Sequence, residues 1–461
     1  MNRLKWILLL VGFSLIHVQC TDFPDPEPPS TGEDEMRELV LYSQYQAAMF
    51  LGGDFSRFSS IWMQQLSGVR GVHLGVENYN PGSIGFDDPW RHFYLELIQS
   101  YNMIDYFATE LDAPVFKGIA LIQRGYFLGL FTDAWGDVPF VESYKYFGSG
   151  RNPVYDSQEE LYEMIFGMLN EGISLLDNPP EGSMVPLPTQ DIFYGGSLED
   201  WQKAARLMKL KFSLRLGNRL GDYAQALSLI EEGGLFSSGA DDWKFPFSTF
   251  TDLENPWYRF DFVVGNTRVG EHMVEMLIDT EDPRLTRFIR LNTQNQYLGA
   301  APGSENFNAS RIANAGGSIG GKSSSLTILS YCEQKFIEAE IYFRHGMQSQ
   351  ADEAYKEAVT ASLAMFDARN AAWEEIHADK KDVDLEDIIN AKYIALFLNP
   401  EVWTDWRRTG YPELDPTPGN FNEDKLPRHF LYPQSEETNN AANYPKDVDL
   451  NTRVWWDANG S

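Results

Sequence analysis

The sequence has 461 residues, enough for one large core or two domains, and its 67 acidic against 37 basic residues give a formal net charge of −30. This charge argues against nucleic acid as a partner, because nucleic-acid binding needs clustered lysine and arginine, and it disfavours attachment to an anionic lipid surface. The chain has only two cysteines, whereas aromatic residues make up 14% of it, so its stability must come mainly from packing.

The N-terminus has the pattern of an export signal. Arg3 and Lys5 precede an apolar run over 6–16 that is too short to span a bilayer as a helix, and this order is typical of a secretory signal peptide. The segment ends at Cys20 and resembles a bacterial lipoprotein signal, although Gln19 departs from the small residue usual before the cysteine. We therefore expect residues 1–19 to be removed and Cys20 to be acylated and anchored in a membrane.

Residues 20–35 are acidic and rich in proline, cannot bury apolar surface, and are predicted to be a flexible tether. The early acids Asp22, Asp25 and Glu27 resemble the surface-export signals of some Gram-negative lipoproteins. Acylation of Cys20 would leave Cys332 without a partner for an intramolecular disulfide.

The remaining chain, 36–461, is predicted to be a single all-α domain. Ser157 and Glu160 have the spacing of a capping box at the start of one helix. Apolar residues at helical spacing predict helices over 35–50, 90–110, 114–131, 157–176, 200–219, 223–232, 330–346, 349–366 and 384–399.

Two pairs of these helices, 200–219 with 223–232 and 330–346 with 349–366, have small residues at their contacts and resemble tetratricopeptide units. Such pairs bury their apolar faces by stacking on neighbours, which predicts a curved helical scaffold. The segments 68–89 and 243–325 and the tail after Pro412 are rich in turn residues and are predicted to be irregular, with 243–325 as a loop-rich insertion over the scaffold.

No motif predicts catalysis. Gly316–Ser323, "GGSIGGKS", has the letters of a phosphate-binding loop, and the helix predicted over 330–346 follows it, but the polar stretch before it is not a buried strand, so we expect no nucleotide site. The seven histidines have no metal-ligand spacing, and Cys332 falls on an apolar helical face. We predict no catalytic residue, cofactor or metal, although a carboxylate pair for glycoside hydrolysis cannot be read from spacing and stays open.

Several stretches, taken in chain order, resemble the SusD/RagB family, in its branch of SusD-like outer-membrane lipoproteins. They are "FTDAWGDVPFVES" from Phe131, "NPVYDSQEELYEMI" from Asn152, "WQKAARLMKLKFSLRLGNR" from Trp201, "DPRLTRFI" from Asp282, "YCEQKFIEAEIYFRHG" from Tyr331, "VWTDWRRTGYPEL" from Val402 and "LPRHFLYPQSEETNN" from Leu426. We expect these motif residues to define the fold and not the ligand site, with the arginines of 407–412 ending a helix and pairing with acids.

The resemblance implies a surface-exposed, lipid-anchored protein of the outer membrane that binds nutrients without catalysis. It implies a SusC-like TonB-dependent transporter as the partner, to which glycan, or peptide in RagB-like members, is delivered. It also implies an all-α fold with tetratricopeptide-like pairs and a loop-rich ligand face. A secreted glycoside hydrolase and a structural or adhesion protein are the competing interpretations.

Ligand contacts are expected on the loops, because sugars bind to aromatic faces flanked by amide and charged groups. Each aromatic among these is also a candidate for ordinary packing, Trp90 most of all because its spacing with Tyr94 suits a helix core. The predicted contacts are Tyr79, Asn80, Trp90, Trp257, Tyr258, Tyr297, Phe307, Asn308 and Arg311.

Overall fold

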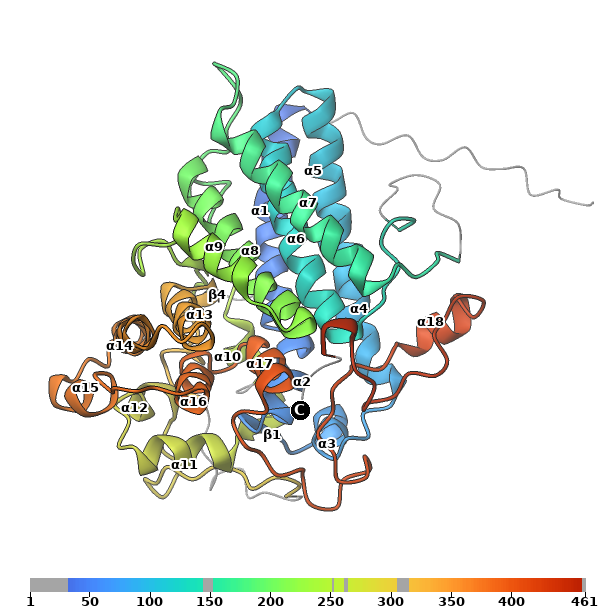
Figure 1. The fold of residues 1–461 in the computed structure, drawn as a ribbon. Coiled ribbons are helices and arrows are strands. Elements are labelled where there is room, and N and C mark those ends of the chain that lie inside the picture. Colours follow the sequence, from blue (N-terminus) through green and yellow to red (C-terminus); the bar gives the residue numbers. More distant parts are fainter. Residues whose placement is uncertain (1–31, 144–151, 251–252, 261–263, 305–314, 458–461) are drawn as a thin grey trace, which may run out of the picture. The chain divides into compact units, whose positions relative to one another are not determined.

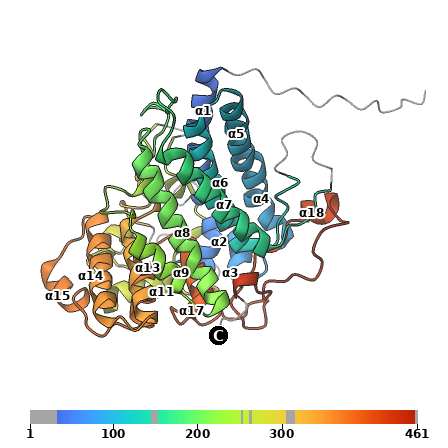
Figure 2. The ribbon, with the colours of Figure 1, turned by 45° about the horizontal axis from the view of Figure 1, so that its top comes forward.

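A bundle of long helices forms the first half of the chain (Figures 1 and 2). In this computed structural model the described residues are 32–143, 152–250, 253–260, 264–304 and 315–457, all within the unit Thr31–Ser461. Cys20, the predicted signal sequence, nearly all of the predicted tether, and Phe307, Asn308 and Arg311 lie outside these residues.

The helix α6(Pro114–Trp135) lies at the centre of the bundle, because nearly all of its residues are buried. It packs against α5(Gln99–Glu110), α7(Gln158–Asp177) and α8(Leu198–Leu220), and α1(Glu33–Leu51) packs against α5. These helices confirm the predicted segments to within a few residues. The capping box at Ser157 and Glu160 is formed as predicted.

The predicted helix over 90–110 starts earlier than expected and is made of three parts. α4(Asp87–His92) continues through the π-helical turn η2(Phe93–Ile98) into α5, with helical backbone angles at both junctions. The segment 68–89, predicted to be a loop, contains α3(Gly71–Glu77) and the short helix η1(Ser83–Phe86). That prediction was wrong because α3 is stabilised by packing of His73 and Val76 and not by helix propensity.

A second group of helices follows in the C-terminal half. α13(Tyr331–Arg344) and α14(Gln348–Met365) form the predicted pair, and small residues such as Ala339, Ala351 and Ala354 lie in their shared core. Outside the segment 243–325, the described residues also form α2(Asp54–Trp62), α9(Ala224–Glu232), α15(Ala371–His377), α16(Leu385–Ala395), α17(Glu401–Thr409), α18(Gln434–Asn439) and η5(Trp455–Asp457).

The segment 243–325 is irregular as predicted, but it contributes short elements that tie it to the scaffold. β2(Trp243–Phe245) pairs antiparallel with β4(Leu326–Leu329), while β1(Leu66–Gly68) pairs antiparallel with β3(Thr267–Val269), so that Leu66 lies opposite Val269. Three helices lie in the same segment: α10(Pro256–Arg259), α11(Glu271–Asp279) and α12(Leu285–Phe288).

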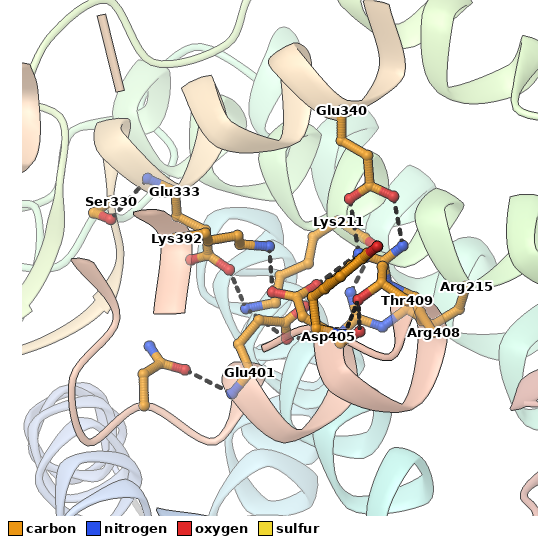
Figure 3. A network of polar contacts seen from close by, with 12 residues as sticks. Lys211, Arg215, Ser330, Glu333, Glu340, Lys392, Glu401, Asp405, Arg408 and Thr409 are labelled. Carbon is orange, nitrogen blue, oxygen red and sulfur yellow. Dashed lines mark hydrogen bonds and ion pairs between the residues drawn. The ribbon is translucent and has the colours of Figure 1, made fainter. Parts of the chain in front are cut away.

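Buried ion pairs connect helices that are far apart in sequence (Figure 3). On α8, Lys211 Nζ lies 2.6 Å from Glu333 Oε1 of α13 and 3.2 Å from Glu401 Oε2 of α17. Arg215 Nη2 lies 2.6 Å from the same Glu401 oxygen, and Arg215 Nε lies 3.2 Å from Asp133 Oδ2 of α6. All five side chains are almost completely buried.

The same network continues along α17. Arg408 makes a bidentate contact with Glu340 at 2.7 and 2.8 Å and binds Asp405 at 2.6 Å, and Lys392 of α16 lies 2.8 Å from Asp405. Arg407 instead donates to the Asp133 carbonyl. The expectation that this motif ends a helix is confirmed by the end of α17 at Thr409, and the expected pairing with acids is confirmed for Arg408.

Candidate ligand-binding surface

The C-terminal end of α3 connects three loops. Glu77 is the last residue of α3, and its carboxylate is buried. Its Oε2 accepts a hydrogen bond from the Gly68 N–H of β1, and its Oε1 accepts one from the Gly303 N–H, both at 2.9 Å. A single side chain therefore fixes a strand and a loop that are more than 200 residues apart in sequence.

The next two residues bind a third segment. The Asn78 carbonyl accepts a hydrogen bond from Phe421 N–H at 2.9 Å, and the Tyr79 hydroxyl accepts one from Thr417 N–H, also at 2.9 Å. Tyr79 has φ 55°, in the left-handed region that is unfavourable for a bulky residue and is found mostly where surrounding contacts impose it. Residues 77–79 thus hold the loops around 303 and 417–421 against α3.

These loops form what we call the candidate surface: residues 78–82, 301–304 and 415–421. They are in direct contact, since a Cβ on Gly303 would lie 3.0 Å from Thr417 Cγ2 and 3.2 Å from the Pro418 carbonyl oxygen. Phe421 is 71% exposed here, and the Asn80 side chain is exposed on an adjacent loop. An accessible aromatic ring beside amide groups matches the chemistry of a sugar-binding platform.

A stack of one guanidinium and two rings connects α3 to α10. The Arg57 guanidinium lies 3.8 Å from the centre of the Phe260 ring, and the Phe260 ring lies 4.6 Å from that of His73 on α3. His73 and Arg57 both contact Asp54, at 3.2 and 2.7 Å. α10 and α3 are therefore neighbours. This contact does not show that residues 255–260 bind ligand, but it places them next to α3, whose C-terminal end holds the candidate surface.

Trp257 and Trp90 lie in the interior. Trp257 is 5% exposed and lies beside the Arg57 guanidinium. Trp90 is also 5% exposed and packs against the rings of Phe131 and Trp135, although one edge lines an open groove of about 590 Å³ between α4 and α18. Tyr79 is buried at 3% and positions a loop through its hydroxyl.

The other predicted contacts among the described residues have accessible surface. Asn80 is exposed, and Tyr258 and Tyr297 are half-buried. The structure brings Asn80 onto the candidate surface and Tyr258 onto the neighbouring α10. For all of these residues, contact with ligand stays a prediction.

The loop with the letters of a phosphate-binding motif has another role. Lys322 Nζ forms an ion pair with Glu254 at 2.8 Å, and the Lys322 carbonyl accepts from Asn255 N–H, the N-cap residue of α10. The strand β4 follows this loop and precedes α13, so the loop does not open a helix as a phosphate-binding loop must. Its lysine and backbone hold α10 in place.

Phe421 was missed by the sequence analysis. It follows the turn Pro418-Gly419-Asn420 in the irregular tail, where neither helical nor strand periodicity provides partners to bury a ring. A large aromatic residue just after such a turn is the signal that could have indicated it.

Within the described ranges, no cluster of three or more histidine, cysteine, aspartate or glutamate side chains could hold a metal ion. The same ranges contain no helix with the length and apolar character needed to cross a membrane.

The fold is a helical scaffold that carries loops from distant parts of the chain at one site. Residues 35–433 match the sequence model of the SusD-like family, described as "Starch-binding associating with outer membrane". Because this match covers most of the chain, the chain belongs to the SusD-like family. A comparison with curated proteins gave no match.

Solved structures share this fold. A SusD/RagB family protein from Bacteroides thetaiotaomicron superposes with a TM-score of 0.79 at 21% identity, covering 92% of this chain and 99% of that one. A chitin-binding SusD homolog from Flavobacterium johnsoniae has a TM-score of 0.76 at 21% identity, covering 93% and 98%. At this identity the similarity shows the fold alone, and it confirms the predicted all-α architecture.

Proposed function

We propose that this protein binds oligosaccharide or polysaccharide at the candidate surface and delivers it to a SusC-like TonB-dependent transporter of the outer membrane. The observation that carries the binding proposal is the exposed Phe421 ring, whose backbone N–H binds the Asn78 carbonyl at the end of α3, on loops that also carry the exposed Asn80. Sugar rings present C–H faces that pack on aromatic rings and hydroxyl groups that bond to amides, so this surface fits a carbohydrate.

The family and its structural relatives support the class of ligand. The family is described as starch-binding and associated with the outer membrane, and one structural relative is a chitin-binding protein. Membrane attachment through acylated Cys20 and partnership with a transporter are the parts of the proposal that rest on the N-terminal sequence and on family membership.

The test is binding of a defined panel of soluble glycans, chito- and malto-oligosaccharides included, measured by calorimetry and by retardation in glycan-containing gels. For a glycan that binds, Phe421→Ala is expected to weaken binding about five- to thirtyfold, since stacking on an aromatic ring contributes about 1–2 kcal/mol. Phe250 is 75% exposed on a loop outside the candidate surface, and Phe250→Ala is the matched control with unchanged affinity expected.

Two outcomes would contradict the proposal. Equal affinity of Phe421→Ala and wild type would remove the candidate surface as the binding site. Retention of peptides and of no glycan would replace the carbohydrate ligand with the peptide alternative, and release of reducing ends from the glycans would indicate a hydrolase.

A further inference from the structure

We propose that Glu77 is a positioning residue for the candidate surface: its ionised carboxylate holds the loop of Gly303 in the binding conformation, and protonation releases that loop, so that glycan affinity falls as the medium becomes acidic. This inference rests on the proposed function for the glycan, and on the geometry of Glu77 for the loop. It assigns to Glu77 a regulatory role without direct contact with ligand.

The geometry places the carboxylate between two backbone donors. Each oxygen of Glu77 accepts one N–H, from Gly68 on one side and Gly303 on the other, and the side chain is 2% exposed. An ionised carboxylate is an acceptor only and suits both donors. A protonated carboxyl group has one oxygen that carries hydrogen, so one of the two N–H groups loses its charged acceptor.

Of the two glycines that bind Glu77, Gly303 is the less tightly packed. Gly68 lies in β1, paired with β3, and is so tightly packed that a Cβ there would lie 1.8 Å from the His73 carbonyl oxygen. Gly303 lies in the 301–304 loop of the candidate surface, beside Thr417 and Pro418. Loss of its bond to Glu77 therefore loosens the contact between the two loops that carry the surface.

Among the described residues, the basic side chains near Glu77 bind other partners and do not pair with it. On α2 and α3, Arg57 and His73 are directed to Asp54, and on β3, Arg268 donates to the carbonyls of Gly265 and Thr267. The titratable group that lies close to Glu77 is the Tyr79 phenol, which accepts a hydrogen bond from Thr417 N–H. No ion pair to Glu77 is formed within this part of the chain.

Burial raises the pKa of Glu77 to about 7, against the opposing effect of the Gly68 and Gly303 N–H groups and the Ser67 hydroxyl. Because the Gly303 N–H lowers this pKa, its hydrogen bond is stronger to the ionised form, so the bond holds the loop above this pH and weakens below it while the side chain stays buried. The effect on global stability has the opposite sign, because a pKa above the unfolded value near 4.5 means that the contribution of this group to stability is complete below pH 4.5 and is lost as the pH rises through 7. A loss of affinity in mild acid is therefore not a loss of the fold.

The loop itself can be observed without any variant. Labelling with ¹³C-carbonyl proline and ¹⁵N-glycine selects only glycines that follow proline, and the chain has three: Gly82, Gly303 and Gly419. We expect the Gly303 amide signal to shift with a midpoint near pH 7, while Gly82, which does not bind the carboxylate, does not follow that transition and is the control. Gly419 adjoins the Pro418 carbonyl that faces Gly303 and is not used as a control. A Gly303 signal that is constant between pH 5 and 8 would overturn the proposal.

The functional arm measures glycan affinity against pH in wild type and Glu77→Gln. If only the ionised form binds, the Kd of the wild type rises about tenfold from pH 8 to pH 6, whereas the variant, which does not titrate, shows no such change. A pH dependence that persists in Glu77→Gln would assign the effect to another group and overturn the proposal. A titrating Gly303 signal in a protein that binds no glycan at any pH would instead contradict the proposed function and leave the loop mechanism standing.

Discussion

Arg215 illustrates how single residues determine the stability of this fold. Its guanidinium is fully buried and bridges Asp133 of α6 and Glu401 of α17. Burial acts to raise the pKa of Glu401, but the charges of Arg215, Lys211 and Lys392 outweigh it and hold that pKa well below its usual range. The stability that this carboxylate contributes is therefore present above the unfolded pKa near 4.5 and is lost as the pH falls below it.

Removing one charge from this network should be costly, because the partners remain buried without compensation. We expect Glu401→Gln, which keeps the shape of the side chain, to lower the free energy of unfolding at pH 7 by about 3 kcal/mol. Urea unfolding followed by fluorescence measures this change. Glu423→Gln is the control, since Glu423 pairs with Lys425 at 3.0 Å on the exposed surface and should cost less than about 0.5 kcal/mol. Similar values for the two variants would show that the network does not hold the helices together.

Most residues of this network, though not Glu401 and Lys392, come from the stretches on which the family resemblance was based. Asp133 lies in "FTDAWGDVPF", Lys211 and Arg215 in the stretch from Trp201, and Asp405 and Arg408 in "VWTDWRRTG". The sequence analysis expected these motifs to define the fold, and the buried ion pairs supply the physical reason.

At the scale of elements, α6 depends on glycines where it meets its neighbours. A Cβ on Gly129 would lie 2.1 Å from Phe212 Cζ of α8, and one on Gly118 would lie 3.0 Å from Leu176 Cδ2 of α7. From α7, a Cβ on Gly172 would lie 2.6 Å from Ile122 Cγ1 of α6. These helices can approach so closely only because glycine, which has no side chain, occupies the contact positions.

A matched pair of glycine variants tests this packing. We expect Gly129→Ala to destabilise the protein by about 1–3 kcal/mol through overpacking, despite the higher helix propensity of alanine. Gly167 is exposed on α7, where an added Cβ would meet no atom within 4 Å, and Gly167→Ala is expected to raise stability by up to about 1 kcal/mol. The two melting temperatures, measured by calorimetry, should move in opposite directions; a shift in the same direction would contradict the packing argument.

The long helices were predictable from the sequence because their apolar spacing and caps are local, as at Ser157 for α7. α3 was not, because a seven-residue helix with two glycines has poor intrinsic propensity and exists through contacts such as those of His73 and Val76. The pairing of β1 with β3 was also beyond local patterns, since each strand has only three residues and the two lie about 200 residues apart.

At the scale of the whole molecule, the sequence predicted which types of residue the candidate surface would contain, but not which of them would be exposed. The sequence indicated aromatic and amide groups on loops and included Asn80, but it could not separate buried rings such as Trp90 and Trp257 from the exposed Phe421. That separation depends on how 78–82, 301–304 and 415–421 meet, and three consecutive residues at the end of α3 fix this through long-range hydrogen bonds.

Attachment of the whole protein to a membrane is the last prediction, and the two cysteines make it testable. Cys20 follows the predicted export signal, and each buried CH₂ of an acyl chain contributes about 0.8 kcal/mol, so that stable anchoring requires more than one chain on this residue. We expect Cys20→Ser to move the protein from the membrane fraction to the soluble fraction and to abolish incorporation of labelled palmitate. Both are measured in cells by fractionation and labelling.

Cys332→Ser is the matched control for this experiment. The Cys332 side chain is buried on α13, and burial raises the pKa of its thiol to about 12, so it is unreactive in the folded protein. A serine there can keep the contact with Ser330 Oγ, which lies 3.2 Å from the sulfur. This variant should remain in the membrane fraction and incorporate label like the wild type. Membrane retention and labelling of Cys20→Ser equal to those of wild type would show that the chain is held by something other than its N-terminal cysteine.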